Sequence, residues 1–189
     1  MSVFLRRFIN NKKYILLFIS IVFIIGFIFG FIIYNLCNQS IKDCFEHVFY
    51  LNNKLYTNYY QMYLIQNALF ILINTYLSTS YYGWIGILFV VFIKAVSLSF
   101  SIIFVFTQLE ISFIILLILL IEFLVEILFL SSISIMTIYL SLYATLVSFC
   151  LEENFNIKSI LNYSLNYLII SLIIFSLSLA LRLYLIPLF

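Results

Sequence analysis

The sequence predicts an all-α fold: a polytopic bundle of about five transmembrane helices, forming a single integral membrane domain over residues 1–189. Hydrophobic residues make up 66% of the chain and charged residues only 8%, whereas a soluble domain averages about 45–50% apolar and about 25% charged residues. Uncharged apolar runs also recur at lengths that can cross a bilayer. This composition excludes a soluble enzyme, a disordered tail and a nucleic-acid binder with a basic face.

The first span is expected at residues 14–36. This run has 23 uncharged residues and would be about 34 Å long as a helix, enough to cross a hydrocarbon core of about 30 Å. It is too long for a signal peptide and lacks a following cleavage site, so we expect it to be retained. Residues 1–13 carry four basic residues and no acid, which favours a cytoplasmic N-terminus. Gly26 and Gly30 form a G-x-x-x-G motif, which indicates a close helix contact or a homo-oligomer face.

Residues 37–61 are the most polar part of the chain and predict an outer amphipathic segment between the first two spans. Four apolar residues recur there at helical spacing, and charged residues take the opposite face. The apolar face either lies on the membrane surface or docks a partner. Its residues are Ile41, Phe45, Val48 and Phe49.

Two further spans are expected at about residues 62–80 and 84–106, joined by a tight turn. Asn67 and Asn74 are seven residues apart in the first of these spans, so they share one helix face. We expect both amides to bond neighbouring helices rather than face lipid, because lipid offers no hydrogen-bond partner.

Residues 111–150 are the most ambiguous stretch. They contain only two charges, Glu122 and Glu126, yet a single helix of this length would reach about 60 Å. Serines at 131, 132 and 134 offer a weak break. The sequence therefore predicts two short spans or one span with a broken or re-entrant part, buried by protein. A last span is expected at about 160–181.

A count of basic residues gives a topology. With five crossings, residues 1–13 and 151–159 lie inside and 37–61 outside. Five Lys or Arg residues then lie inside and two outside, in agreement with the positive-inside rule.

Three charged residues lie within predicted spans: Lys94, Glu122 and Glu126. Lys94 and Glu122 are expected near the membrane midplane, and Glu126 lies one turn beyond Glu122 on the same face. A lone charge there costs about 2.5–3.5 kcal/mol on insertion scales, which a Lys–Glu pair would offset. Such a pair either fixes helix register or lines an ion or proton pathway. No nucleotide-binding, zinc-protease or serine-hydrolase motif occurs, so the sequence predicts a non-enzymatic protein without cofactor or metal.

Several stretches together resemble a known family. Residues 14–36 match its first span, with an I-G-x-x-x-G ending and a following Asn. Residues 66–69, QNAL, resemble its asparagine-bearing second span, and 83–100 its third span with a mid-helix Lys followed by a small residue. Residues 120–142 resemble the stretch in which many members have Pro-His-Gly and then a Glu, which Glu126 matches. On these residues the chain resembles the stage II sporulation protein M family of bacterial membrane proteins.

The resemblance implies a multi-pass protein of the bacterial cell membrane that acts as a scaffold rather than as an enzyme. Its partners would be membrane lipid and peptidoglycan hydrolases that resemble stage II sporulation proteins D and P, held at the membrane during forespore engulfment or cell-wall remodelling. The chain departs from the family at Ile121-Glu122-Phe123, which stand in place of Pro-His-Gly. The alternative function is that of a membrane subunit of a transporter, with Lys94, Glu122 and Glu126 along a polar path.

Overall fold

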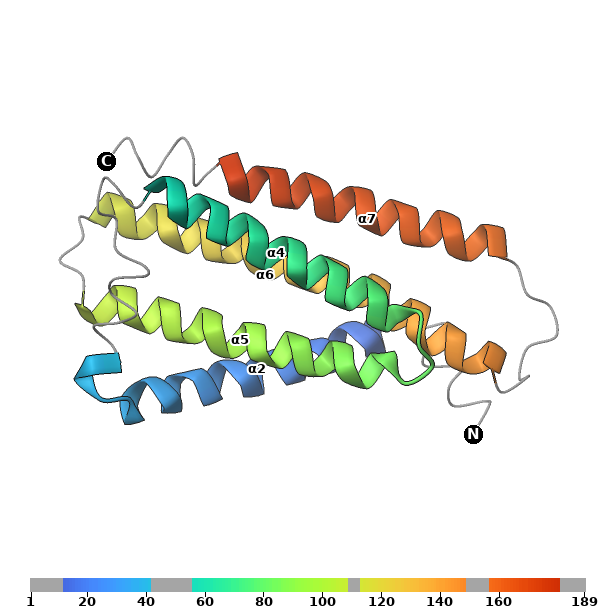
Figure 1. The fold of residues 1–189 in the computed structure, drawn as a ribbon, viewed down its shortest axis with the longest axis horizontal. Coiled ribbons are helices and arrows are strands. Elements are labelled where there is room, and N and C mark those ends of the chain that lie inside the picture. The colour runs from blue at the N-terminus through green and yellow to red at the C-terminus, as the bar shows by residue number, and fades with distance from the viewer. Residues whose placement is uncertain (1–11, 42–55, 109–112, 149–156, 181–189) are drawn as a thin grey trace.

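A computed structural model describes residues 12–41, 56–108, 113–148 and 157–180. These residues are built from long α-helices and contain no strand, which confirms the all-α part of the prediction (Figure 1). Long apolar runs take this form because a helix satisfies its own backbone hydrogen bonds, as lipid requires. The helices are α2 (Lys12–Leu36), α4 (Tyr56–Ser78), α5 (Gly83–Gln108), α6 (Phe113–Ser148) and α7 (Ile157–Ala180).

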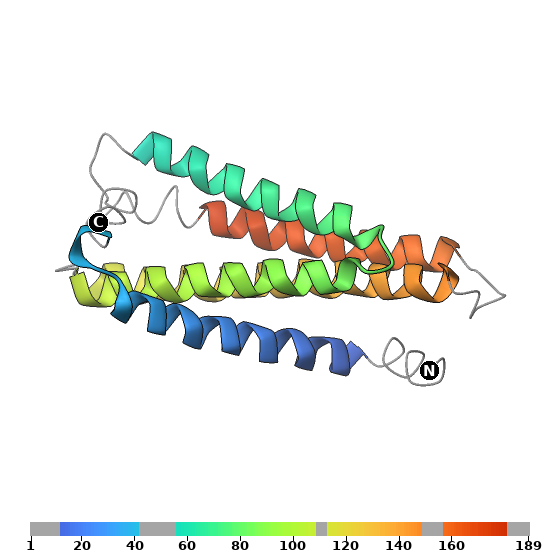
Figure 2. The same cartoon turned by 60° about the horizontal axis from the view of Figure 1, so that its bottom comes forward.

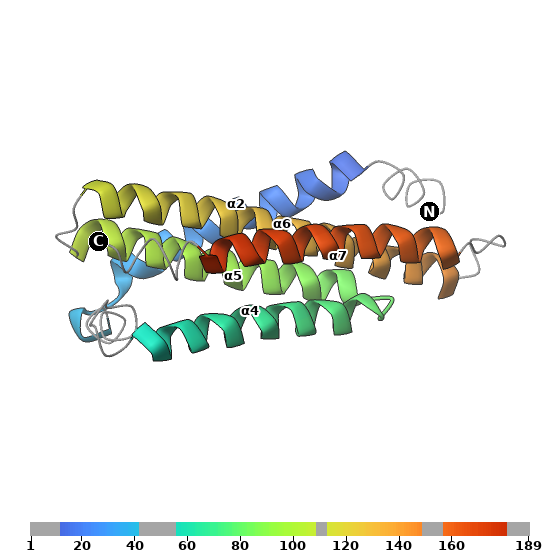
Figure 3. The same cartoon turned by 90° about the horizontal axis from the view of Figure 1, so that it is seen from above.

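The helices lie roughly along one long axis, and each runs in the opposite direction to the one before it (Figures 1 and 3). α5 and α6 form the centre. α2 packs along α5, α7 packs along α6, and α4 contacts both central helices. α2 and α4 lie on opposite sides of α5 (Figure 2). The beginning of α2 and the α4–α5 turn therefore lie toward the same end of the bundle.

Three helices among the described residues are long and apolar enough to cross a membrane. The candidate spans are Lys13–Leu36, Gly83–Phe100 and Leu120–Ser148, and α7 contains a shorter apolar stretch, Ser164–Leu177. These segments indicate a membrane protein. The count of five crossings stays a prediction.

The region 111–150 differs from its predicted form, because α6 is one continuous helix of 36 residues rather than two spans or a broken one. The hydroxyls of Ser131, Ser132 and Ser134 donate to carbonyl oxygens three or four residues earlier, at 2.9, 2.9 and 2.7 Å. Serine hydroxyls that donate in this way find their hydrogen-bond acceptors within the helix, so the helix is not interrupted. α6 is consequently about 54 Å long, well beyond the about 30 Å of a hydrocarbon core.

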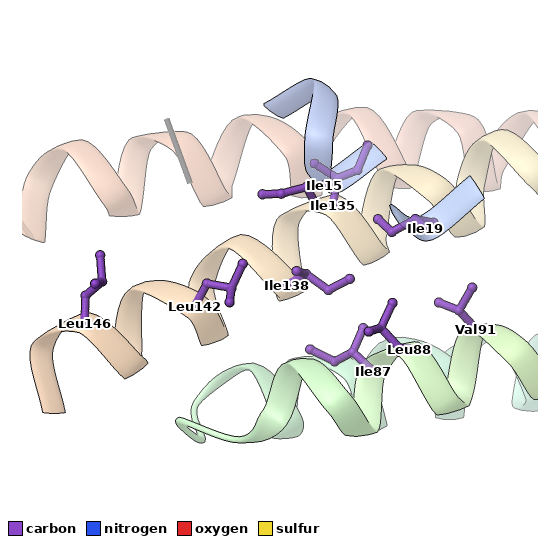
Figure 4. Close-up of a cluster of buried hydrophobic side chains, with 9 residues drawn as sticks. All are labelled: Ile15, Ile19, Ile87, Leu88, Val91, Ile135, Ile138, Leu142 and Leu146. Carbon is purple, nitrogen blue, oxygen red and sulfur yellow. The ribbon is translucent and has the colours of Figure 1, made fainter. Parts of the chain in front are cut away.

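The interior of the bundle is filled by two main apolar clusters. The first joins α2, α5 and α6 and is drawn in Figure 4; the second joins α4, α5 and α6. Both lie along α6, the most enclosed of the three candidate spans. The first contains Ile15, Ile19, Ile87, Leu88, Val91, Ile135, Ile138, Leu142 and Leu146, and the second contains Phe70, Leu98, Phe123, Phe129, Leu130 and Ile133.

The turn between α4 and α5 is fixed by two hydroxyls of α6. Ser141 donates to the carbonyl of Ser80 at 2.7 Å and accepts from the backbone N–H of Trp84 at 2.8 Å. Thr145 donates to the carbonyl of Tyr81 at 2.6 Å. The N–H of Trp84 is one of the first donors of α5, which have no partner within the helix, and Ser141 supplies its acceptor. The turn is thereby attached to the central helix.

Candidate functional site

The most polar part of the interior is centred on Lys94, in the middle of α5. Its Nζ lies 3.8 Å from Oε1 of Glu126 on α6 and donates to Oδ1 of Asn67 on α4 at 3.3 Å. One ammonium group therefore joins three helices. We call Lys94, Glu126, Asn67 and the neighbouring Glu122 the polar cluster.

An aromatic ring completes the surroundings of Lys94. The Nζ lies 5.8 Å from the centroid of Phe70, within the range of a cation–π contact. Phe70 is 2% exposed and belongs to the second apolar cluster. It comes three residues after Asn67 and so lies on the same face of α4. Sequence reasoning missed Phe70, although its spacing from Asn67 was a usable signal.

The two glutamates both point into the bundle. Glu122 and Glu126 are 1% and 4% exposed and lie one turn apart on α6. The sequence left open which of them pairs with Lys94, and the geometry brings Glu126 to Lys94. Charges removed from water in this way carry a large desolvation cost, which only close pairing and further hydrogen bonds offset. The cluster therefore restricts how α4, α5 and α6 can be arranged.

The two predicted asparagines are both fully buried but make different contacts. Asn67 accepts from Lys94 on a neighbouring helix, whereas Asn74 donates to the carbonyl of Phe70 in its own helix at 2.8 Å. Nδ2 of Asn67 and Oδ1 of Asn74 have no hydrogen-bond partner among the described residues. The polar cluster thus keeps one unused donor beside a cation, and one unused acceptor lies outside the cluster, two turns along α4.

The two glycines of the G-x-x-x-G motif lie in the contact between α2 and α5. A Cβ at Gly26 would come within 2.8 Å of the Phe92 carbonyl oxygen, and one at Gly30 within 2.5 Å of the Val96 carbonyl oxygen. The hydroxyls of Tyr34 and Thr107 bond further along the same pair of helices. Within this chain the motif is used to bring the α2 and α5 backbones together.

The predicted docking face falls mostly outside the described residues. Ile41 is exposed at the end of the first described range. Phe45, Val48 and Phe49 lie outside the described residues, as do residues 1–11 of the predicted cytoplasmic N-terminus.

The polar cluster contains a cation, two carboxyl groups and an amide. The cation pairs with the carboxylate of Glu126 and donates to the amide oxygen of Asn67. The described ranges contain no group of three or more His, Cys, Asp or Glu residues that could hold a metal ion. The contacts observed there include one ion pair and one hydrogen bond between helices.

Comparison of the chain with family models, curated proteins and solved structures finds no match.

Proposed function

We propose that this chain is a non-enzymatic, multi-pass membrane anchor that holds peptidoglycan hydrolases at a bacterial cell membrane, as the resemblance to the stage II sporulation protein M family implies. Its role would be forespore engulfment or cell-wall remodelling. Tethering an enzyme beside its polymeric substrate raises its effective concentration without any new catalytic group.

One observation supports this proposal above the others. Lys94 contacts Glu126 and Asn67, which lie on two other helices. A buried group used in this way sets the relative positions of three helices, because moving α5 or α6 separates the charges of Lys94 and Glu126 in a medium of low polarity, and moving α4 breaks the hydrogen bond of Asn67. A rigid bundle suits an anchor, whose surface must present partners in a fixed arrangement.

The test is capture of wall hydrolases by variants of the predicted docking face. Ile41, Phe45, Val48 and Phe49 are replaced by Ser in a tagged full-length chain, which is recovered from mildly solubilised membranes of the native host. The matched control replaces Asp43 and Glu46, on the opposite face of the same predicted helix, by Asn and Gln. We expect the first variant to insert normally and lose the hydrolases, and the control to keep them. Normal capture by the first variant would remove the docking face from the proposal.

A second candidate is the membrane subunit of a transporter. It is favoured by the buried Glu126 beside Lys94, by the second buried carboxyl group of Glu122 one turn away on α6, and by the unused Nδ2 of Asn67. Polar groups that are expensive in lipid often mark a path for ions or protons.

A charge-neutral double variant separates the two functions. Lys94→Met alone leaves Glu126 without its cation and so lowers stability in either case. Lys94→Met with Glu126→Gln removes both charges, so the bundle can remain intact. An anchor carrying the double change still captures its partners, whereas a transporter loses flux.

A further inference from the structure

The outward face of α7 carries a seam of residues that nothing in the described chain covers. α7 packs along α6, and its inward residues repeat at helical spacing around the buried Ser171. On the opposite side, exposed residues follow one another at intervals of four, three, four and three. This outer seam consists of Asn162, Asn166, Ile169, Ile173 and Ser176.

The spacing of the outer seam is that of a heptad stripe. With 100° per residue, its members lie within about 40° of one direction, and Ser171 lies on the opposite side of the helix. A stripe of this kind is the geometry by which one helix packs along another over several turns. The α6-facing side of α7 is a separate stripe, so both can be occupied at once.

The outer seam lies at the depth of the membrane-crossing part of α6. The ring of Phe175 stacks on Phe129 of α6, with the centroids 5.3 Å apart, and Tyr167 packs against the first apolar cluster. Phe129 belongs to the candidate span Leu120–Ser148, and Asn166 lies inside the apolar stretch Ser164–Leu177 of α7. The seam therefore runs alongside the candidate span of α6, where hydrocarbon would surround it.

Two amides on this face need partners that lipid cannot provide. Neither Asn162 nor Asn166 makes a hydrogen bond within the described residues, and both are exposed, in contrast to Asn35 on α2, which donates to its own helix at 3.1 Å. Carboxamide groups carry both a donor and an acceptor, so two identical groups facing each other satisfy both. Asparagines on lipid-facing helices drive helix association for this reason.

We propose that the outer seam of α7 binds the same seam of a second copy of this chain, through paired carboxamides of Asn162 and Asn166. A self-complementary amide pair fits a two-fold contact in which each patch meets its equivalent. The G-x-x-x-G motif, the other association signal in the sequence, is occupied by α5 within the chain. The inference concerns self-association and does not depend on which partner the anchor holds.

Self-association is measured by energy transfer between donor-labelled and acceptor-labelled full-length chains, diluted with lipid in vesicles of phosphatidylethanolamine and phosphatidylglycerol. We expect wild-type chains to associate, and Asn162→Leu with Asn166→Leu to weaken association about ten-fold. Both changes make α7 more apolar, so insertion is not impaired. The matched control is Asn35→Leu, an exposed asparagine on α2, which should leave association unchanged. Monomeric wild type, or unchanged association in the double variant, would overturn the proposal.

Cross-linking locates the contact independently. In a chain whose native cysteines are replaced by Ser, Ile169→Cys lies on the seam and Ile170→Cys lies about 80° from the middle of the seam. Disulfide-linked dimers should form at 169 and not at 170. Equal cross-linking at both positions, or cross-linking of Ile169→Cys only to a different membrane protein, would contradict a second copy as the occupant.

Discussion

Lys94 of α5 and Glu126 of α6 form an ion pair inside the bundle, with 3.8 Å between Nζ and Oε1. The same Nζ reaches Asn67 of α4 at 3.3 Å, so a single side chain contacts three helices. The pair constrains the packing of these helices, because separating the two side chains would leave each charge buried without its partner.

Breaking this pair should destabilise the protein more than removing it completely. Lys94→Met leaves a buried carboxyl group without its cation and is expected to lower the free energy of unfolding by about 3 kcal/mol. Lys94→Met with Glu126→Gln should be clearly more stable than the single Lys94 variant, because no lone charge remains. Unfolding in mixed micelles, followed by the fluorescence of Trp84, measures both. Strictly additive losses would mean that the two side chains do not interact.

Alanine at Gly30 should separate α2 from α5. The new Cβ would lie 2.5 Å from the Val96 carbonyl oxygen and 2.8 Å from Cβ of Ser99, and a backbone atom cannot yield. We expect a loss of about 1–3 kcal/mol in the free energy of unfolding. Gly86→Ala is the matched control, because its Cβ would meet only the flexible side chain of Leu77, at 3.0 Å. Equal effects of the two substitutions would show that the close backbone approach at Gly30 is unimportant.

Loss of the Ser141 hydroxyl should loosen the α4–α5 turn. Ser141→Ala removes one of two donors to the Ser80 carbonyl and the acceptor for the Trp84 N–H, and an N–H left without a partner away from water costs about 1–3 kcal/mol. Hydrogen exchange of the Trp84 amide should accelerate. Ser131→Ala, whose hydroxyl bonds only its own helix, is the control and should leave that exchange rate unchanged. Unaltered exchange in Ser141→Ala would contradict the attachment of the turn to α6.

Because the helices alternate in direction, the end of α2 and the α4–α5 turn should lie on opposite sides of the membrane. In a chain with its native cysteines replaced by Ser, Asn38→Cys should react with a membrane-impermeant maleimide in intact cells. Ser80→Cys, in the α4–α5 turn, should react only after the membrane is permeabilised. Labelling of both positions from outside would contradict the predicted topology with a cytoplasmic N-terminus.

The helices themselves could be predicted well from the sequence. The spans expected at 14–36 and 84–106 correspond to α2 and α5 within a few residues, because long uncharged runs have few other stable forms in lipid. The break expected in 111–150 was wrong, since the hydroxyls of Ser131, Ser132 and Ser134 bond within α6. The length of this stretch also favours a break, but a helix that is too long for the bilayer can extend beyond it.

The site could be predicted in composition but not in pairing. Burial of a Lys and two Glu residues in lipid makes some pairing necessary, yet the sequence does not fix the rotation of α6 that brings Glu126 to Lys94. It also gave no reason for Asn67 rather than Asn74 to contact Lys94. The sequence also does not show that α5 packs on Gly26 and Gly30, because residue spacing identifies a small-residue face of a helix without identifying the helix that packs on it.

The most direct test of the anchor is to identify what the intact, tagged chain holds in mildly solubilised membranes of its native host, by mass spectrometry. We expect peptidoglycan hydrolases, retained by the variant that carries both Lys94→Met and Glu126→Gln. Recovery of a nucleotide-binding subunit with no wall enzymes, and its loss in that double variant, would contradict the anchor and make the polar cluster the centre of a transport mechanism.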